Sequence, residues 1–365
     1  MNLTRVQSLA AVLLVCGPLL AQVPSLEVDA SWPQPLPSKW SIGPISSIAV
    51  GPNDHVWILQ RPAAIKPDEK NGTTPAPPVI EYDTQGKVVQ AWGGPGAGYD
   101  WPLNEHRIFV DYKGNVWIAG VGGKDWGRIL KFTSTGKFLL QIGRPLPAGE
   151  TFTNNNSTVL GRQPADVDVD PKTNELYVAD GDGGAQRVMV FDAETGAFKR
   201  LWGAYGEKPE DGPAAKHDPN GPPSKFFSAA VHCVRIAKDG LVYACDRNGD
   251  RIQAFHENGK FVKEGIMAPK TMGLGSAYDL DFTPDQKYLY VADGTNHKVW
   301  ILQRDSLEIV GSIGREDSNS GEFQNIHTLA VDSKGNLITA EITNKRLQKF
   351  VPKTSASAPL AFRRP

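Results

Sequence analysis

The chain has 365 residues, and its 39 Lys and Arg residues nearly balance its 40 Asp and Glu residues, so the formal net charge is −1. A protein that binds nucleic acid through phosphate contacts carries a basic excess, so no nucleic-acid partner is expected here. Hydrophobic residues make up 40% of the chain, and 37 Gly and 28 Pro residues interrupt it at short intervals. This composition excludes a disordered or mainly helical chain and favours many short strands joined by turns.

The N-terminus has the pattern of a secretory signal peptide. A basic residue near the start precedes an apolar stretch from Leu9 to Leu20, and the small residue Ala21 follows. The stretch is too short to span a bilayer, so we expect a signal peptide over residues 1–21 and a periplasmic or secreted mature protein. Cys16 raises the alternative of lipid modification, but Val15 replaces the small residue that such processing favours. No later segment is long and apolar enough to suggest membrane contact after cleavage.

A single motif repeats six times along the rest of the chain. Each copy has the order strand, turn, strand, polar loop with Asp or Arg, strand, Gly turn and strand. The second strands mark the register at Asn53–Ile58, Gly114–Ile118, Asn174–Val178, Gly240–Ala244, Tyr288–Val291 and Gly335–Thr339. Six four-stranded copies predict an all-β chain that forms a six-bladed β-propeller over residues 22–353, followed by a C-terminal tail over residues 354–365.

The third strands alternate apolar and polar residues, as half-buried strands do. The last copy lacks an outer strand of its own, because the residues after 353 are turn-like. We expect Leu26–Ala30 to supply that strand and close the ring. Two stretches break the repeat, Pro62–Pro78 and Gly203–Pro223, and each is interpreted either as a solvated loop or as a rim over one mouth of the central channel.

Histidine recurs at one register of the first strands. Four residues before the last apolar residue of each first strand stand Ser46, His106, Ala165, His232, Tyr278 and His327. First strands of a propeller line its central channel, so three imidazoles from alternate blades are expected to converge near the axis. Three His ligands with an open fourth position form a catalytic zinc site.

The alternative is that these histidines are polar residues that only fill the channel. The chain has 7 His in all, and three of them share one register in alternate copies, which favours the metal site. The other four fall in turns or loops and are expected at the surface: His55, His217, His256 and His297.

The fourth copy resembles a known family. Its segment over residues 232–255, HCVRIAKDGLVYACDRNGDRIQAF, is similar to the zinc-ligand blade of peptidyl-α-hydroxyglycine α-amidating lyase. That enzyme is a six-bladed NHL-repeat propeller that cleaves a carbinolamide to a peptide amide and glyoxylate. The resemblance implies two arginines at the site, matched by Arg61 and Arg247, for which the alternative is a structural ion pair at a blade junction. It also implies a zinc ion bound by His106, His232 and His327.

Other positions depart from the family's pattern. Asp182 stands where the lyase has its essential tyrosine, and Thr328 replaces an acid that helps to hold a structural calcium ion. Asn325 replaces a methionine near the third histidine. By position, the candidates for proton transfer are Asp182, Asp246 and Tyr278. A calcium site is therefore less strongly expected than a zinc site. Hydrolysis of an ester or lactone by water is as compatible with these residues as the lyase reaction.

Two cysteines lie on one hairpin of the fourth copy. A turn that pairs Ala237 with Leu241 also pairs Cys233 with Cys245 in the same register. In an oxidising compartment these are either a cross-strand disulfide or two buried free thiols. Neither interpretation makes Cys233 a nucleophile.

Two functions from different classes fit these observations. The first is a zinc-dependent lyase or hydrolase that takes a small-molecule or peptide substrate at the channel mouth. The second is a non-catalytic secreted scaffold whose rim binds a protein, peptide or glycan. A calcium-dependent lactonase propeller is ranked last, because it needs carboxylates in the channel and the first-strand register shows none. The zinc enzyme requires that the three imidazoles meet at one point.

Overall fold

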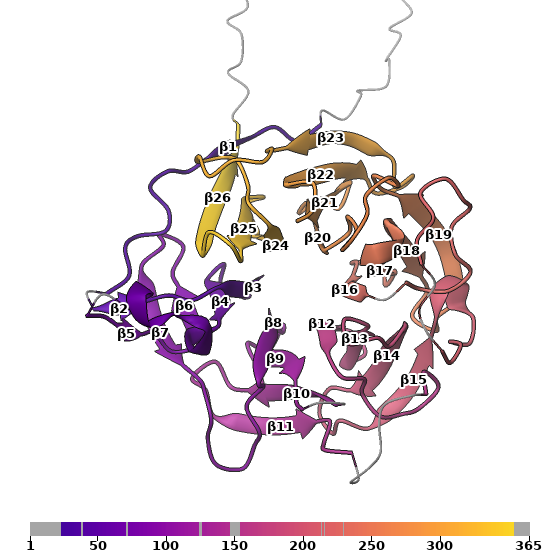
Figure 1. The fold of residues 1–365 in the computed structure, drawn as a ribbon, viewed down its shortest axis with the longest axis horizontal. Coiled ribbons are helices and arrows are strands. Elements are labelled where there is room, and N and C mark those ends of the chain that lie inside the picture. The colour runs from indigo at the N-terminus through magenta and orange to yellow at the C-terminus, as the bar shows by residue number, and fades with distance from the viewer. Residues whose placement is uncertain are drawn as a thin grey trace, which may run out of the picture.

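A computed structural model describes residues 23–353 except for residues 38, 71, 124–125, 147–153, 213, 215 and 229. Within these residues, six four-stranded antiparallel sheets are arranged in a ring around one axis, which confirms the six-bladed propeller (Figure 1). The predicted signal peptide over residues 1–21 and the tail over residues 354–365 lie outside the described residues. No helix among the described residues is long and apolar enough to span a membrane.

Each blade runs from an inner strand beside the axis to an outer strand on the circumference (Figure 1). Blade one contains β3 (Ile45–Val50), β4 (Val56–Gln60), β6 (Val79–Tyr82) and β7 (Val88–Trp92). Blade two contains β8 (Asn104–Val110), β9 (Val116–Val121), β10 (Gly127–Phe132) and β11 (Phe138–Ile142). Blade three contains β12 (Pro164–Val169), β13 (Glu175–Asp180), β14 (Arg187–Asp192) and β15 (Phe198–Trp202).

The second half of the chain continues the same order. Blade four contains β16 (Val231–Ile236), β17 (Val242–Asp246), β18 (Arg251–Phe255) and β19 (Phe261–Ile266). Blade five contains β20 (Asp279–Phe282), β21 (Tyr288–Asp293), β22 (Lys298–Gln303) and β23 (Ile309–Ile313). Blade six contains β24 (Ile326–Val331), β25 (Leu337–Glu341), β26 (Arg346–Pro352) and β1 (Leu26–Val28).

Strand β1 closes the ring, as the sequence predicted. It pairs antiparallel with β26, with Leu26 opposite Pro352 and Val28 opposite Phe350. The two ends of the propeller are therefore joined in one sheet. This pairing also covers the edge of β26, which would otherwise expose unpaired backbone groups.

The hydrophobic core is divided among the six blade junctions. Six apolar clusters each join two neighbouring blades. Between blades two and three, for example, Trp117 and Ile129 lie in one cluster with Val167 and Val178. Burying one aliphatic side chain of this size contributes about 1.5–3 kcal/mol. Stability is thus distributed around the ring, and the axis is left for polar residues.

The repeated acid and basic residues of the polar loops are structural. An acid at the end of a second strand forms an ion pair with an arginine at the start of the third strand, at Asp180–Arg187, Asp246–Arg251 and Glu341–Arg346. The Arg251 guanidinium also donates hydrogen bonds to the carbonyl oxygens of Ser224 and Phe226, at 2.7 Å each, in the connection from the preceding blade. Asp246 is fully buried and paired with Arg251 in this arrangement, and its role in proton transfer stays a prediction.

The cysteine hairpin has the predicted register. Cys233 on β16 lies opposite Cys245 on β17, and the two form a disulfide with a Cα–Cα distance of 4.8 Å. The structure therefore favours the disulfide over two free thiols.

The two insertions are partly ordered rather than simple loops. The first carries two short 3-10 helices, Pro62–Ala64 and Pro67–Glu69, and a strand β5 (Thr74–Pro75) that pairs in parallel with β2 (Trp40–Ser41). In the second insertion, the Tyr205 hydroxyl accepts a hydrogen bond from Arg251 at 2.9 Å. Both insertions are thus held against the propeller by specific contacts.

Candidate metal centre

The histidines occupy β-bulges of the inner strands. In five blades the pairing of the inner strand with the second strand skips one residue, at Ser46, His106, Ala165, His232 and His327. In blade five Tyr278 stands at the same register, directly before β20. A bulge leaves its extra residue unpaired and redirects the side chain. The register found in the sequence is therefore the position where each inner strand turns a side chain toward the axis.

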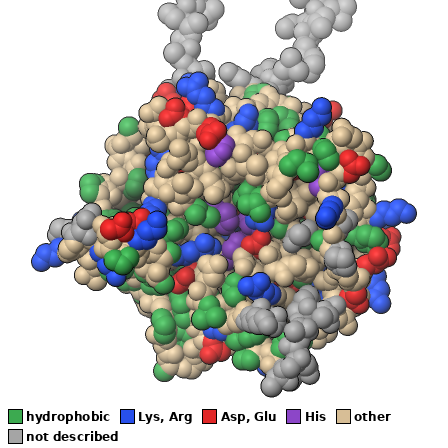
Figure 2. Space-filling model, in the orientation of Figure 1, with side chains coloured by type: hydrophobic (Ala, Val, Ile, Leu, Met, Phe, Trp, Pro, Cys, Tyr) green, Lys and Arg blue, Asp and Glu red, His purple; other side chains and the backbone are tan. Residues whose placement is uncertain are grey.

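The three imidazoles meet near the axis with nearly threefold symmetry. Each pair of ring centroids among His106, His232 and His327 is 5.1 Å apart. One ring nitrogen from each residue lies within 4.8 Å of those of the other two, and all three side chains are buried. Figure 2 shows histidine side chains, with basic and acidic side chains beside them, at the centre of this face of the propeller. The structure thus brings the three predicted ligands together.

The next blade around the propeller fixes the orientation of each imidazole. The Nδ1 atoms of the three histidines lie at hydrogen-bond distance from backbone carbonyl oxygens of the next blade: His106 from Ala165 at 2.9 Å, His232 from Tyr278 at 2.6 Å, and His327 from Ser46 at 2.6 Å. A carbonyl oxygen only accepts, so each Nδ1 carries a proton, and Nε2 is the ring atom left to bind a metal ion. Backbone partners of this kind orient histidine ligands in metal sites.

The donor set fits a divalent metal ion such as zinc. His232 Nε2 is buried without a hydrogen-bond partner among the described residues. Burial lowers the pKa of His232 well below its usual range, and the charge of Arg247 acts in the same direction. Burial likewise lowers the pKa of His327. Neutral imidazoles with free Nε2 lone pairs are the form in which histidine binds zinc.

Arg247 and Arg61 lie at the same mouth of the channel. Arg247 follows β17, donates a hydrogen bond to Asp182 Oδ1 at 3.0 Å, and stacks over the Tyr278 ring at 5.1 Å. Arg61 follows β4, and its Nε donates to the Glu105 carbonyl oxygen at 2.8 Å, across the junction of blades one and two. Burial lowers the pKa of Arg61, although the charges of Glu105 and Asp182 oppose that effect. Each arginine therefore forms a hydrogen bond to a neighbouring blade and also lies near the histidines.

Asp182 is in direct contact with the histidine cluster. Its Oδ2 lies 3.2 Å from His106 Nε2, and its side chain is largely buried. The Gln163 side-chain amide donates a second hydrogen bond to Oδ2. The sequence pattern did not identify Gln163, which lies two residues before the register position of blade three.

Tyr278 is placed as a platform rather than as a base. Its hydroxyl lies 3.0 Å from Thr295 Oγ1, and its backbone carbonyl orients His232. Burial raises the pKa of Tyr278, so the phenol stays protonated at neutral pH. The predicted role of Tyr278 in proton transfer is thus limited to donating a proton, since a protonated phenol cannot accept one.

A layer of paired charges lies next to the histidines along the inner strands. Arg107 on β8 contacts Asp166 at 2.5 Å and Asp279 at 2.8 Å, and Arg235 on β16 lies 3.4 Å from Asp279. The register position itself carries no carboxylate, as the sequence showed, but the next residue of two inner strands does, at Asp166 and Asp279. These acids are engaged by arginines, and Thr328 has no carboxylate to add, so they do not form the open oxygen cage that calcium prefers.

The remaining histidines lie away from this centre. His256 is exposed, as expected for a surface residue. The other three are partly buried and bonded: His55 to Glu81, His217 to the carbonyl oxygen of Pro269, and His297 to the backbone N–H of Asn325. For these three the expectation of surface residues was only partly right.

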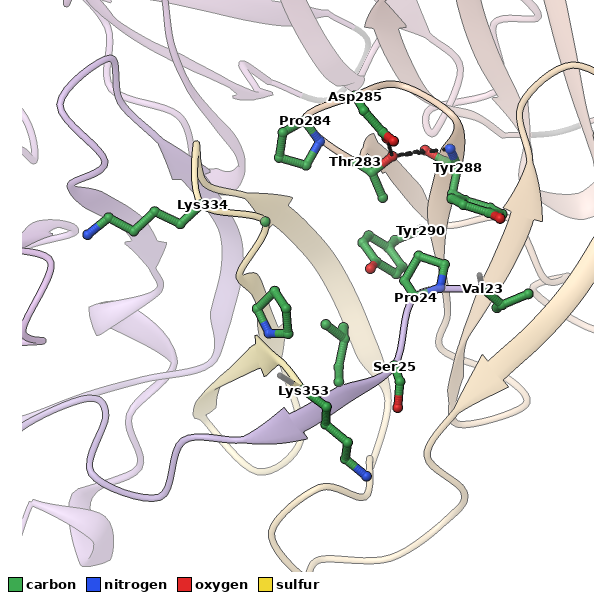
Figure 3. A pocket seen from close by; sticks show the side chains of 13 residues that line it. Val23, Pro24, Ser25, Thr283, Pro284, Asp285, Tyr288, Tyr290, Lys334 and Lys353 are labelled. Carbon is green, nitrogen blue, oxygen red and sulfur yellow. Dashed lines mark hydrogen bonds between the residues drawn. The ribbon is translucent and has the colours of Figure 1, made fainter. Parts of the chain in front are cut away.

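A larger cavity, of about 620 Å³, lies at the circumference beside the closing strand. Figure 3 shows Pro24, Tyr288, Tyr290, Lys334 and Lys353 around it. Its lining contains no histidine, so the cluster of buried polar groups at the axis is the stronger candidate for chemistry.

Comparison with known proteins gives the family. No family model matches the chain. Human NHL repeat-containing protein 3 is 30% identical over 299 residues, which cover 76% of this chain and 74% of that protein. The mouse protein of the same name is 28% identical over 345 residues, which cover 90% of this chain and 85% of that protein. Peptidyl-glycine alpha-amidating monooxygenase B of Xenopus laevis is 24% identical over 360 residues, which cover 92% of this chain but 36% of that longer protein.

A solved structure supports the same fold. Streptogramin B lyase superposes with a TM-score of 0.53 at 13% identity, over 90% of this chain and 98% of that one. At this identity the likeness extends to the propeller alone. Together with the six blades and the sequence relatives, it shows that the chain belongs to the NHL-repeat propeller family that includes NHL repeat-containing protein 3.

Proposed function

We propose that this protein is a zinc-dependent enzyme, a lyase or hydrolase that acts on a small molecule or peptide with a negatively charged group. The observation that carries the proposal is the meeting of three buried imidazoles, each held at Nδ1 by a backbone carbonyl, with Nε2 of His232 left without a partner among the described residues. A structural role in channel packing gives no reason to leave the buried Nε2 of His232 without a partner.

The residues around the histidines suggest the kind of substrate. Arg61 and Arg247 place two positive charges at the mouth, which the carboxylates of Asp182 and Glu105 offset. A bound zinc ion would supply Lewis-acid chemistry, which polarises an oxygen of the substrate or activates water near neutral pH. The mouth would then carry excess positive charge, and a guanidinium can bind a carboxylate through paired hydrogen bonds. An anionic substrate is thus favoured over a neutral one.

The similarity to peptidyl-glycine alpha-amidating monooxygenase B, over 92% of this chain, supports peptides ending in α-hydroxyglycine as the first substrates to test. In that reaction the bond between the amide nitrogen and the hydroxyl-bearing carbon breaks. The hydroxyl group loses its proton as the aldehyde of glyoxylate forms, and the amide nitrogen gains a proton. Asp182 replaces the family tyrosine, so simple anionic esters belong in the same assay.

We also propose that the protein acts outside the cytoplasm. The support is the signal-like N-terminus and the Cys233–Cys245 pair, since disulfides persist in oxidising compartments. Fractionation of cells that express the full chain would test this, with the mature protein expected in the periplasmic or secreted fraction. Retention of the uncleaved chain in the cytoplasm would contradict it.

The activity test uses the purified mature protein, stripped with a chelator and reloaded with zinc. The assay follows glyoxylate release from a peptidyl-α-hydroxyglycine and acid release from anionic esters. We expect turnover only in the zinc-loaded protein, its loss in His232→Ala, and its retention in His256→Ala, which removes an exposed histidine. Zinc binding without turnover of any of these substrates would leave the binding scaffold as the better function.

A further inference from the structure

We infer that Asp182 is a fourth metal ligand, so that the centre is a three-His, one-Asp site rather than a three-His site with an open position. The inference rests on the proposed metal site and goes beyond it. Asp182 lies in the loop that follows β13 of blade three, a blade that contributes no histidine. It is one of the places where this chain departs from the family pattern.

Asp182 is in direct contact with the His106 ring. Their closest atoms, Nε2 and Oδ2, are 3.2 Å apart. Because His106 Nδ1 donates to the Ala165 carbonyl oxygen at 2.9 Å, Nε2 is the ring atom that faces the carboxylate. A lone pair and a carboxylate oxygen repel each other at this distance unless a cation lies between them.

The carboxylate is held so that it cannot turn away. Arg247 donates to Oδ1 at 3.0 Å, and Gln163 donates to Oδ2. Metal-ligating carboxylates are generally fixed by such hydrogen bonds from neighbouring side chains. The side chains around Asp182 therefore orient Oδ2 toward the histidines.

The cation between them is either a proton or a metal ion. A proton on His106 Nε2 would satisfy that one contact, but it would leave His232 Nε2 buried and unpartnered. A metal ion satisfies both, together with His327, whose ring lies 5.1 Å from each of the other two. Zinc bonds of about 2.0–2.2 Å place neighbouring ligands of a tetrahedral site about 3.3–3.6 Å apart, slightly more than the 3.2 Å observed.

A fourth protein ligand changes how the centre works. The resting site is closed, as in structural zinc sites, and an external oxygen must displace the carboxylate or add as a fifth ligand. Asp182 also removes one unit of positive charge from a buried site in which three imidazoles contribute none. We therefore expect tight metal retention and weak binding of simple anions.

The experiment compares the mature protein with Asp182→Asn after each is stripped and reloaded with Co²⁺. We expect the parent protein to show the intense visible absorption of tetrahedral cobalt, unchanged by azide. In Asp182→Asn we expect altered bands that respond to azide. Zinc affinity, measured by competition with a chromophoric chelator, should fall by more than the roughly 10–100-fold that loss of an outer hydrogen-bond partner costs.

Controls separate the outcomes. Asp218→Asn changes an exposed acid and should behave as the parent. Near-ultraviolet circular dichroism checks that each variant is folded. If the parent takes up no metal, the proposed function itself fails. If the parent binds metal but Asp182→Asn keeps its spectrum and affinity, only the inference fails, and Asp182 is a hydrogen-bonding neighbour of a three-His centre.

Discussion

Two neighbouring layers of buried polar side chains lie near the propeller axis, a charged layer and a histidine layer, and they differ in how these side chains are paired. In the charged layer, Arg107 lies between Asp166 and Asp279, and these carboxylates also accept backbone N–H groups of the adjacent blades. In the histidine layer, the Nδ1 atoms are satisfied but the Nε2 lone pairs point toward one another. Both layers alternate around the ring. Blades three and five supply acceptors in both layers, and blade one supplies the Ser46 carbonyl oxygen to His327 of blade six.

This difference indicates that the charged layer stabilises the fold and that the histidine layer is the candidate for function. A buried polar group is costly unless it is paired, so a folded chain satisfies nearly all of them. The charged layer pairs its arginines with the protein's own carboxylates and ties opposite blades together. The histidine layer leaves His232 Nε2 without a partner among the described residues.

The largest effect is expected from breaking the charged layer. Arg107→Met leaves Asp166 and Asp279 buried without their main partner, and removal of one member of a buried ion pair costs about 3–5 kcal/mol. Denaturant unfolding measures the loss. The control Arg315→Met removes an exposed arginine and should change stability by less than about 1 kcal/mol. Equal effects of the two substitutions would contradict the structural role of the charged layer.

A smaller loss is expected from the disulfide that joins β16 to β17 behind His232. For the double variant Cys233→Ser, Cys245→Ser we expect the free energy of unfolding to fall by about 3 kcal/mol, the value for a short closed loop. Denaturant unfolding with and without reductant checks this, because reductant should destabilise only the parent. If reductant leaves the parent unaffected, the two cysteines are free thiols.

A still smaller effect concerns pH and the charged layer. Burial raises the pKa of Asp168 to about 7, although Arg235 and the backbone N–H of Ile236 oppose the rise, and Asp166 adds to it. The folded state therefore binds a proton that the unfolded state has lost, so stability falls as pH rises from about 4 to about 7. Asp168→Asn should remove on the order of 1–2 kcal/mol of that fall, measured as unfolding free energies at pH 5 and pH 8. An identical fall in the variant would assign the pH dependence to other groups.

The smallest effect is expected from Tyr278→Phe in the histidine layer. The variant loses one hydrogen bond to Thr295, worth about 0.5–1.5 kcal/mol, and keeps the ring beneath Arg247. Because the phenol stays protonated at neutral pH, catalytic turnover should change little. A stable variant with strongly reduced turnover would instead make the Tyr278 hydroxyl a proton donor.

The sequence predicted the fold and the histidines because both follow a repeat. Six aligned copies give the blades, the closing strand and the register that brings His106, His232 and His327 together. The charged layer was missed because its residues differ from blade to blade. Arg107 pairs with Asp166 and Asp279, which lie on two other blades, so no single copy of the repeat shows the ion pairs. The contact of Asp182 with His106 was missed for the same reason, since it joins blades three and two. Gln163 was missed because it lies before β12, outside the register that the repeat defines.

The most direct test is the metal content of the purified mature protein and of His232→Ala, measured by mass spectrometry. The account predicts about one zinc ion per chain in the parent and in His256→Ala, and none in His232→Ala, with all three folded. Absence of metal from the parent even after incubation with zinc would contradict it, and would reduce the three histidines to polar residues that fill the channel.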